Sequence, residues 1–437
     1  MELKKYALSD VCTIVPGFAF KSNDFGSGEN IAVKIKDIEP PSVNIKNAER
    51  VCFTPQDKFR LSEGDYIMAM TGATIGKVGK LQIDAKNVYI NQRVCKFNPI
   101  TSVCDKEYLY YVLSTSSFRN FIYNNVDSKL AQPNIGHTTI YKYIHLFPSN
   151  IKEQKLIASV LNNIDRKIEL NKQINDNLEA MAKQLYDYWF VQFDFPNEEG
   201  KPYKSSGGAM VWNERLKREI PIGWTCCSIK EMCDINKKTI NKDEHKQIEY
   251  LDTGSITQGH ISNTEIYNVD MAPSRAQRKV EDLSILYSSV RPRLLHYGIL
   301  SKPKENFIVS TGFVTLDAKC KKMALMVYYF LTSNTITEHL ASIADTAVSS
   351  YPSISPDDIA YLDIVIPSND IIQKYNDIVE PMFRKMSTLR KEIDSLTKQR
   401  DELLPLLMNG QATVNYHLSS FPHRSFDHSF APKSTRL

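Results

Sequence analysis

Basic, amide and hydroxyl side chains gather around the predicted turns of this chain, and such groups can contact DNA. Arg, Lys, Gln and Asn read base edges, whereas Thr, Lys and the N–H groups of glycine turns hold phosphates. In the first 150 residues the candidates are Lys34, Lys36, Thr71, Thr74, Lys77, Gln92, Arg93, Lys129, Gln132 and Asn134. Further along they are Arg275, Arg278, Lys279, Arg291, Arg293, Tyr297, Thr311 and Tyr351. Taken singly, each is better interpreted as an ordinary loop residue, but the two sets together favour recognition.

Segments that resemble catalytic or cofactor-binding motifs do not fit on inspection. GATIGKVGK (72–80) is similar to a phosphate-binding loop, but only three residues separate its first two glycines, and Val78 stands where Ser or Thr must bind Mg²⁺. A tight glycine turn between strands is the better interpretation. The nine histidines and eight cysteines show no metal-ligand spacing, and no nucleophile elbow is present. We therefore expect no catalytic residue, no metal site and no cofactor bound by this chain.

The sequence contains an internal repeat, in which two halves of the chain are similar. QPNIGHTTIYKYIHLFPSN (132–150) matches YPSISPDDIAYLDIVIPSN (351–369) at a shift of 219 residues, and LSDVCTI (8–14) matches IKEMCDI (229–235) at a shift of 221. NQRVCKF (91–97) lies opposite STGFVTL (310–316), again at 219. Several matches that differ in shift by only two residues predict a duplicated unit.

Each copy is followed by a long stretch with helical periodicity. Residues 151–193 and 370–404 contain no glycine, and Pro381, which lacks an N–H, predicts a kink or a restart of the second helix. Apolar residues at 3/4 spacing in the second stretch predict a coiled coil. The first stretch has two apolar stripes, and its Asn171 and Asn175 either fix the register of a seam or lie at the wet edge of a wide core face. The residues expected in the coiled coil or a subunit interface are Ile157, Leu161, Ile164, Ile168, Ile174, Leu178, Met181, Leu185, Met382, Met386, Leu389, Ile393, Leu396 and Leu403.

Composition places the chain among ordinary globular proteins. Its 437 residues carry a net charge of +4 and are 42% hydrophobic, which excludes a disordered chain and a histone-like polycation. The apolar runs fall short of the ~20 residues that cross a membrane, and the N-terminus lacks the apolar segment of a signal peptide. We expect a cytoplasmic protein with reduced cysteines.

Taken together, these motifs resemble the specificity (S) subunit of a bacterial type I restriction–modification system. The resemblance covers about residues 1–415 and rests on LSDVCTIVPGFAF (8–20), EGDYIMAMTGATIGK (63–77), FPSNIKEQKLIASVLNNIDRKIELNKQI (147–174), YSSVRPRLLHYGI (287–299) and RDELLPLLMNG (400–410). One departure is Asp282-Leu283, which stands where the first copy has Gly64-Asp65. This departure predicts a different turn before the strand that follows.

The resemblance implies an α+β fold in which two similar target recognition domains, mixed α/β with a β-rich core, are separated by two long helices packed as an antiparallel coiled coil. The expected recognition domains are 1–150 and 196–369, the long helices 151–195 and 370–410, and the tail 411–437 is expected to be disordered. Each domain would read one half of a bipartite, asymmetric double-stranded DNA target, and the helices would set the spacer. Two methylation (M) subunits would bring S-adenosylmethionine, restriction (R) subunits would bring ATP and Mg²⁺, and this chain would catalyse nothing.

Two other functions stay open from the residues alone. The first is a catalytically active restriction or methylation fusion, which the missing cofactor motifs disfavour. The second is a coiled-coil scaffold with no role on DNA, which the paired domains disfavour.

Overall fold

The computed structural model describes residues 2–126, 133–241, 244–346 and 352–414. The predicted positions Lys129, Gln132 and Tyr351, and most of the predicted tail, lie outside these ranges. The chain forms two compact units, Met1–Ile168 with Ser395–Leu437, and Glu169–Asp394. Both long helices therefore contribute to each unit.

The first unit is built around a six-stranded sheet with the strand order β2-β10-β7-β8-β5-β4. Its strands are β2 (Cys12–Pro16), β4 (Ile38–Glu39), β5 (Ser42–Val43), β7 (Tyr66–Ala69), β8 (Val78–Lys80) and β10 (Val94–Pro99). A three-stranded sheet shares an apolar core with it and consists of β3 (Phe25–Val33), β6 (Glu49–Val51) and β9 (Val88–Ile90). A separate strand pair joins β1 (Leu3–Ala7) to β11 (Ile144–Pro148).

Short helices pack on the sheets of the first unit and bury their apolar side chains there. Asp105 and Thr115 begin two of them, since their side chains accept the N–H groups of Tyr108 and Phe118. The helices are α1 (Leu8–Val11), α2 (Lys106–Ser114), α3 (Ser116–Asn124) and α4 (His137–Ile140).

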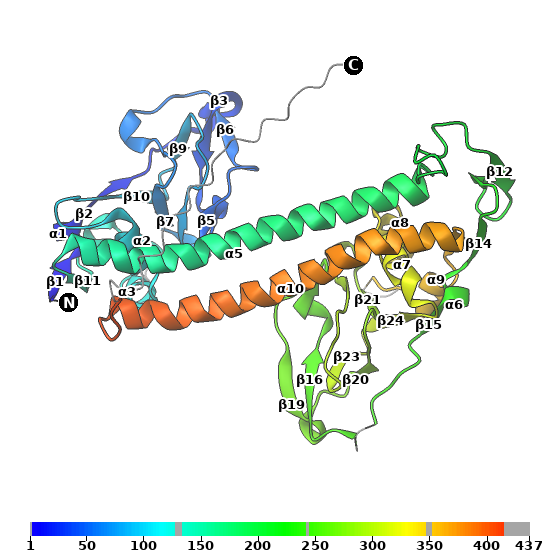
Figure 1. The fold of residues 1–437 in the computed structure, drawn as a ribbon. Coiled ribbons are helices and arrows are strands. Elements are labelled where there is room, and N and C mark those ends of the chain that lie inside the picture. The colour runs from blue at the N-terminus through cyan, green and yellow to red at the C-terminus, as the bar shows by residue number, and fades with distance from the viewer. Residues whose placement is uncertain (1, 127–132, 242–243, 347–351, 415–437) are drawn as a thin grey trace. The chain divides into compact units, whose positions relative to one another are not determined.

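The second unit has two four-stranded sheets, β15-β24-β21-β22 and β19-β16-β23-β20 (Figure 1). Their strands are β15 (Cys233–Ile235), β16 (Gln247–Leu251), β19 (Glu265–Asn268), β20 (Ala276–Lys279), β21 (Ile285–Ser288), β22 (Tyr297–Ile299), β23 (Phe307–Ser310) and β24 (Phe313–Ala318). The smaller pairs are β12 (Met210–Asn213) with β13 (Arg218–Pro221), β14 (Thr225–Ser228) with β25 (Asp363–Ile366), and β17 (Ile256–Thr257) with β18 (His260–Ile261). The helices are α6 (Ile229–Met232), α7 (Ala324–Leu331), α8 (Asn334–Thr346) and α9 (Pro356–Ala360).

The two units pair their strands in the same register. Cys12 lies opposite Pro99 in the first unit, and Cys233 lies opposite Ala318 in the second. These pairs are related by the shifts of 221 and 219 residues that relate the two halves of the sequence. The same relation holds for Lys4–Phe147 with Thr225–Ile366, for Tyr66–Lys80 with Ile285–Ile299, and for Val94–Ala69 with Phe313–Ser288. The predicted duplication is confirmed strand by strand.

The turn before β7 and the turn before β21 are the same, contrary to prediction. Gly64 and Leu283 both have a left-handed backbone, with φ of +79° and +66°. Their N–H groups donate to the carbonyl oxygens of Leu81 and Leu300, which are equivalent positions. Leu283 is buried, so packing of its side chain offsets the steric cost that a glycine avoids.

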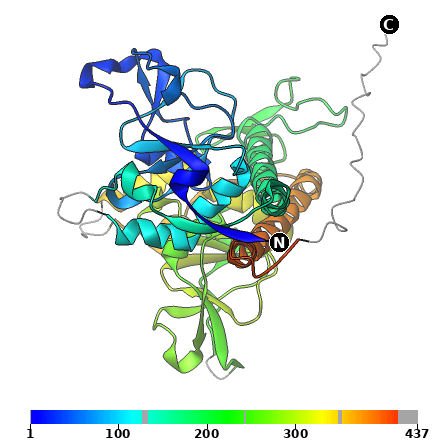
Figure 2. The same ribbon diagram turned by 90° about the vertical axis from the view of Figure 1, so that its left-hand side faces the viewer.

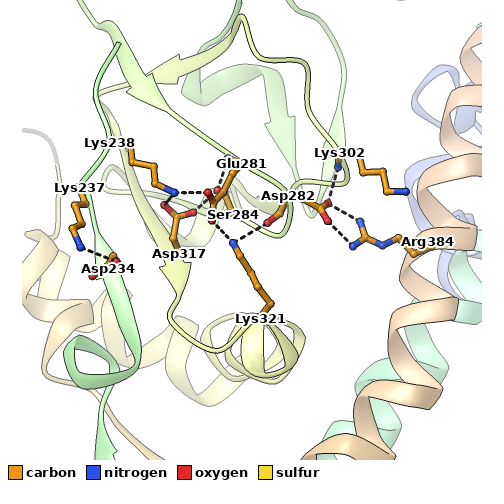
Figure 3. Close-up of polar contacts among 10 residues, drawn as sticks. All are labelled: Asp234, Lys237, Lys238, Glu281, Asp282, Ser284, Lys302, Asp317, Lys321 and Arg384. Atoms are coloured by element: carbon orange, nitrogen blue, oxygen red, sulfur yellow. Dashed lines mark hydrogen bonds and ion pairs between the residues drawn. The ribbon is translucent and has the colours of Figure 1, made fainter. Parts of the chain in front are cut away.

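A polar network surrounds this turn in the second unit (Figure 3). Lys238 and Lys321 both bind Glu281, and the hydroxyl of Ser284 donates to Asp317. Burial by itself raises the pKa of Glu281, but the bonds from the two lysines outweigh it and hold that pKa below its usual range. Charge pairing therefore holds the start of β21 in place.

Each long helix is one continuous element, and Figure 2 shows both nearly end-on. α5 (Ile151–Tyr186) has 36 residues and continues as a π-helical turn, Asp187–Val191. α10 (Asn369–Met408) has 40 residues and runs through Pro381, so the predicted restart is wrong. Pro381 is exposed, and buried Val379 and Phe383 on either side of it anchor the helix in the core.

Within each unit α5 and α10 run antiparallel, as the fold class predicts. In the first unit Arg400 binds Asp165, with Nη1 3.1 Å from Oδ1. In the second unit the amide of Asn171 donates to Glu392 Oε2 at 3.1 Å. Asn171 and Asn175 are both buried, which favours the seam over the wet edge.

The predicted seam residues divide into those that are covered and those that are not. The covered ones, buried or half-buried, are Ile157, Leu161, Ile164, Ile168, Leu178, Leu185, Met382, Met386, Leu389, Ile393, Leu396 and Leu403. Ile174 and Met181 are instead exposed, together with Leu170 and Tyr188. These four residues, the α5 stripe, lie on the second apolar face of α5 and of the π-helical turn that continues it and contains Tyr188. Ile174 and Met181 are therefore not part of the seam.

Candidate DNA-recognition surfaces

The candidate residues of the first unit meet beyond the end of β7. The N–H of Met70 donates to Arg93 O at 2.9 Å, and the N–H of Ile135 donates to Met70 O at 3.0 Å. The N–H of Gly72 donates to Pro133 O at 2.9 Å. These bonds bring together three segments that carry the predicted residues Thr71, Thr74, Lys77, Gln92, Arg93 and Asn134.

The segment 72–76 is a glycine turn, as predicted, and not a phosphate-binding loop. It joins β7 to β8 through a single 3₁₀ turn, Gly72–Thr74. Gly72 and Gly76 have φ of +76° and +79°, and a Cβ on Gly76 would lie 3.2 Å from Ile122 Cγ2. Among the described residues, Thr71 Oγ1 and Thr74 Oγ1 are buried without a hydrogen-bond partner. A polar ligand group or water at the turn would satisfy them.

Lysines on the neighbouring turn are held by a carboxylate. Lys34 and Lys36 place Nζ 2.5 and 3.1 Å from the two carboxylate oxygens of Glu49. Their hydrogen bonds hold the pKa of Glu49 below its usual range. Ile35, between them, has Cδ1 3.6 Å from where a Cβ of Gly72 would lie, so this turn adjoins the glycine turn. The two lysines are therefore less available to phosphates than Lys77, which is exposed.

In the second unit the three equivalent segments also come together, and they carry different side chains. The N–H of Arg291 donates to Pro352 O at 2.9 Å, as Gly72 does to Pro133. The N–H of Ile354 donates to Ser289 O at 2.8 Å, as Ile135 does to Met70. A further bond, from Thr311 N–H to Arg275 O at 2.9 Å, brings in the start of β20.

The predicted cations of the second unit differ in exposure and in partners. Arg275 and Arg291 are exposed. Arg293 binds Asp345 and Glu338 on α8, at 2.6 and 3.2 Å, and Lys279 binds Glu244 at 2.9 Å. Arg278 donates to Asn236 O at 3.0 Å, and burial lowers its pKa. Arg278 is therefore the least accessible of these arginines, and Arg275, Arg291 and Arg293 all reach the surface.

Tyr297 belongs to the core rather than to the surface. It is 4% exposed and its ring stacks on Tyr287, with centroids 5.8 Å apart. Burial raises the pKa of its hydroxyl. The side chain has almost no surface to offer to DNA, which corrects its prediction as a contact.

The first unit exposes Phe53, an aromatic side chain that is not among the predicted contacts. Phe53 is 45% exposed, and its ring stacks on Phe18 with centroids 5.2 Å apart. Asn30 donates to Phe53 O at 3.0 Å and so fixes its backbone. The available signal was the density of aromatic residues, since five phenylalanines fall within residues 18–59.

The second unit carries a segment with no counterpart in the first. Phe195 lies between the rings of Tyr203 and Trp224, with centroids 4.6 and 4.8 Å away. The hairpin β12–β13 follows, and Val211 and Trp212 on it are exposed. The segment adds an apolar surface beyond the duplicated fold.

Within the described ranges, no group of three or more His, Cys, Asp or Glu residues could hold a metal ion. No helix in the same ranges is long and apolar enough to cross a membrane.

Comparison with known families accounts for both halves of the chain. The family model of the type I restriction modification DNA specificity domain matches residues 1–180 and 221–398, which is most of the sequence. The chain belongs to this family. The two matches correspond to two copies of a DNA specificity domain, and recognition of DNA sequence is the function of this specificity subunit.

Individual relatives agree with the family. The chain is 27% identical over 318 residues to the type I restriction enzyme MjaIX specificity subunit of Methanocaldococcus jannaschii, covering 70% of this chain and 69% of that protein. It is 25% identical over 177 residues to the HindI specificity subunit of Haemophilus influenzae, covering 40% and 38%. The crystal structure of an S subunit from M. genitalium is similar in fold, with a TM-score of 0.60 at 18% identity over 93% of this chain and 96% of that one.

Proposed function

We propose that each unit of this specificity subunit reads one half of a bipartite, asymmetric sequence in double-stranded DNA. The observation that carries the proposal is that both units build the same meeting of three segments and place different side chains on it. Gln92, Arg93 and Asn134 of the first unit correspond to Thr311, Gly312 and Ser353 of the second. One backbone frame with two sets of hydrogen-bonding groups suits two different half-sites.

The two long helices would set the spacer between the half-sites. A helix of 36 residues is about 54 Å long and resists bending. A rigid connection presents the second reader at high effective concentration once the first has bound, which turns two weak contacts into one strong one.

Two methylation subunits would dock on this chain and bring S-adenosylmethionine, and restriction subunits would bring ATP and Mg²⁺. The α5 stripe supports a protein partner, because four large apolar residues in helical spacing are exposed along one face. The hairpin β12–β13 offers a second apolar surface. In this assignment the chain itself contributes recognition and no catalysis.

The test is to express the chain with its methylation subunit in a host and to map N6-methyladenine by single-molecule sequencing. We expect a two-part motif. Replacing residues 1–150 with the matching domain of another specificity subunit should change one half only. Four residues inserted in α5 should change the spacer and keep both halves. A motif that is not divided, or a spacer unaffected by the insertion, would contradict the proposal.

A further inference from the structure

Three backbone positions in the turns before and after β7 and β21 are left-handed in both units, and the residue types differ. In the first unit all three are glycines, at positions 64, 72 and 76. In the second unit the equivalent residues are Leu283, Arg291 and Leu295, with φ of +66°, +48° and +57°. A side chain at such a position has a steric cost that glycine avoids.

Packing accounts for the two leucines. Leu283 is buried, and Leu295 packs against the apolar core of the second unit. Arg291 is exposed, so core packing does not account for it. It also precedes Pro292, and a residue before proline is biased toward extended conformations. The turn therefore holds Arg291 in a conformation that both its Cβ and its neighbour disfavour.

The backbone around Arg291 is fixed at several points. Its N–H donates to Pro352 O at 2.9 Å, and its carbonyl oxygen accepts the N–H of Leu294 at 2.9 Å. Two residues further on, the guanidinium of Arg293 binds Asp345 and Glu338 on α8. These bonds fix the position of the Arg291 Cα atom and the direction of its Cα–Cβ bond.

We propose that Arg291 reads a guanine in the half-site bound by the second unit. The inference rests on the proposed function, that each unit reads a half-site. A guanidinium donates two parallel hydrogen bonds to O6 and N7 of guanine in the major groove. Such a two-point contact needs a side chain that starts from a rigid position, whereas attraction to a phosphate does not. Gly72 stands at this position in the first unit and has no side chain, so other residues of that unit would contact the bases.

The experiment replaces Arg291 with the residue of the first unit and follows the methylation motif. In the complex with the methylation subunit, Arg291→Gly should leave the melting temperature unchanged or raised, because the left-handed strain is relieved. One guanine of the second half-site should lose its discrimination by roughly 5- to 150-fold, while the first half-site and the spacer stay the same. Leu295→Gly is the matched control, since it removes a side chain at a left-handed position of the same turn without changing charge, and its motif should be unchanged.

A second variant keeps the test open if the glycine variant does not assemble. Arg291→Gln retains a side chain at the same backbone position and removes the guanidinium, so it should also lose the guanine. The inference is overturned if the second half-site contains no guanine, if both variants methylate the original motif, or if binding weakens evenly over all sequences, as for a phosphate contact. A lower melting temperature with an unchanged motif would assign Arg291 a structural role and overturn it as well. A wild-type complex without sequence preference would overturn the proposed function itself.

Discussion

The turns beyond β7 and β21 have the same backbone and different chemistry. The first uses Gly72 and Gly76 where the chain is left-handed, and the second uses Arg291 and Leu295. Gln92 of the first unit corresponds to Thr311 of the second, and each unit binds some of its lysines to a carboxylate, Lys34 to Glu49 and Lys279 to Glu244. Duplication therefore preserved the strand register and the hydrogen-bonded turns, while the side chains on the shared frame diverged.

The largest difference in stability that we expect is between mutations at two equivalent strand positions, one of which is more deeply buried than the other. Phe147 is fully buried against the rings of Tyr6 and Tyr108, whereas its counterpart Ile366 is half-buried. Phe147→Ala should destabilise the first unit by about 3–5 kcal/mol, and Ile366→Ala the second by about 1 kcal/mol. Hydrogen exchange, read separately for the amides of each unit, measures both. Equal losses of unfolding free energy would contradict the difference in burial between Phe147 and Ile366.

The next effect concerns Arg384, which binds Asp282 through two bonds of 2.7 Å beside the turn before β21 (Figure 3). Arg384→Ala should destabilise the second unit by about 1 kcal/mol, because Asp282 keeps contact with water after the loss. Lys374→Ala, which removes an exposed pair with Asp370, is the control and should have no measurable effect. Losses of equal size would show that the Arg384 pair is no stronger than a surface contact.

The same pair predicts a pH dependence. Burial alone raises the pKa of Asp282, but the bonds from Arg384 and from the Lys302 N–H outweigh it and hold the pKa below its ordinary 3.8. A lowered pKa stabilises the folded state above the unfolded value, and this stabilisation is lost as the pH falls through the folded value. The difference in unfolding free energy between wild type and Arg384→Ala should therefore shrink from about pH 6 to about pH 3. A constant difference would contradict this.

An effect of similar size tests the left-handed positions directly. Gly72→Arg should destabilise the first unit by about 1 kcal/mol, which is the cost of a left-handed backbone for a residue with a Cβ. The side chain adds no clash, because its Cβ would lie in ordinary van der Waals contact, 3.6 Å from Ile35 Cδ1. Gly76→Arg should be worse, since its Cβ would lie 3.2 Å from Ile122. Thermal unfolding of the two variants ranks them. The reverse order would mean that packing around the turn differs from the contacts described.

The smallest effect on stability is expected on the α5 stripe. Ile174→Ser and Met181→Ser should change the unfolding free energy by less than about 0.5 kcal/mol, because both side chains are exposed. They should nevertheless weaken association with the methylation subunit in a pull-down titration. Ile378→Ser, at an exposed apolar residue of α10, is the control and should leave association intact. Unchanged binding by the stripe variants would move the partner's docking site elsewhere.

Much of the fold was accessible from local patterns. The repeat at a shift of 219 to 221 residues predicted equivalent strands, and the glycine-free periodic stretches predicted α5 and α10. Pro381 predicted a kink or a restart of the helix, and the restart does not occur because burial on both sides of it outweighs one missing backbone bond. Leu283 misled the prediction because a buried leucine can occupy a left-handed position that sequence alone assigns to glycine.

The amino-acid sequence by itself determined the duplication, the long helices and the segments that carry polar residues, since these depend on spacing along the chain. Only the tertiary structure decided which cations stay exposed and which side chains are buried. Arg293 is bound by Asp345, 52 residues away, and Tyr297 is buried in the apolar core of the second unit. Partners and burial depend on contacts between distant segments, and no local period encodes them.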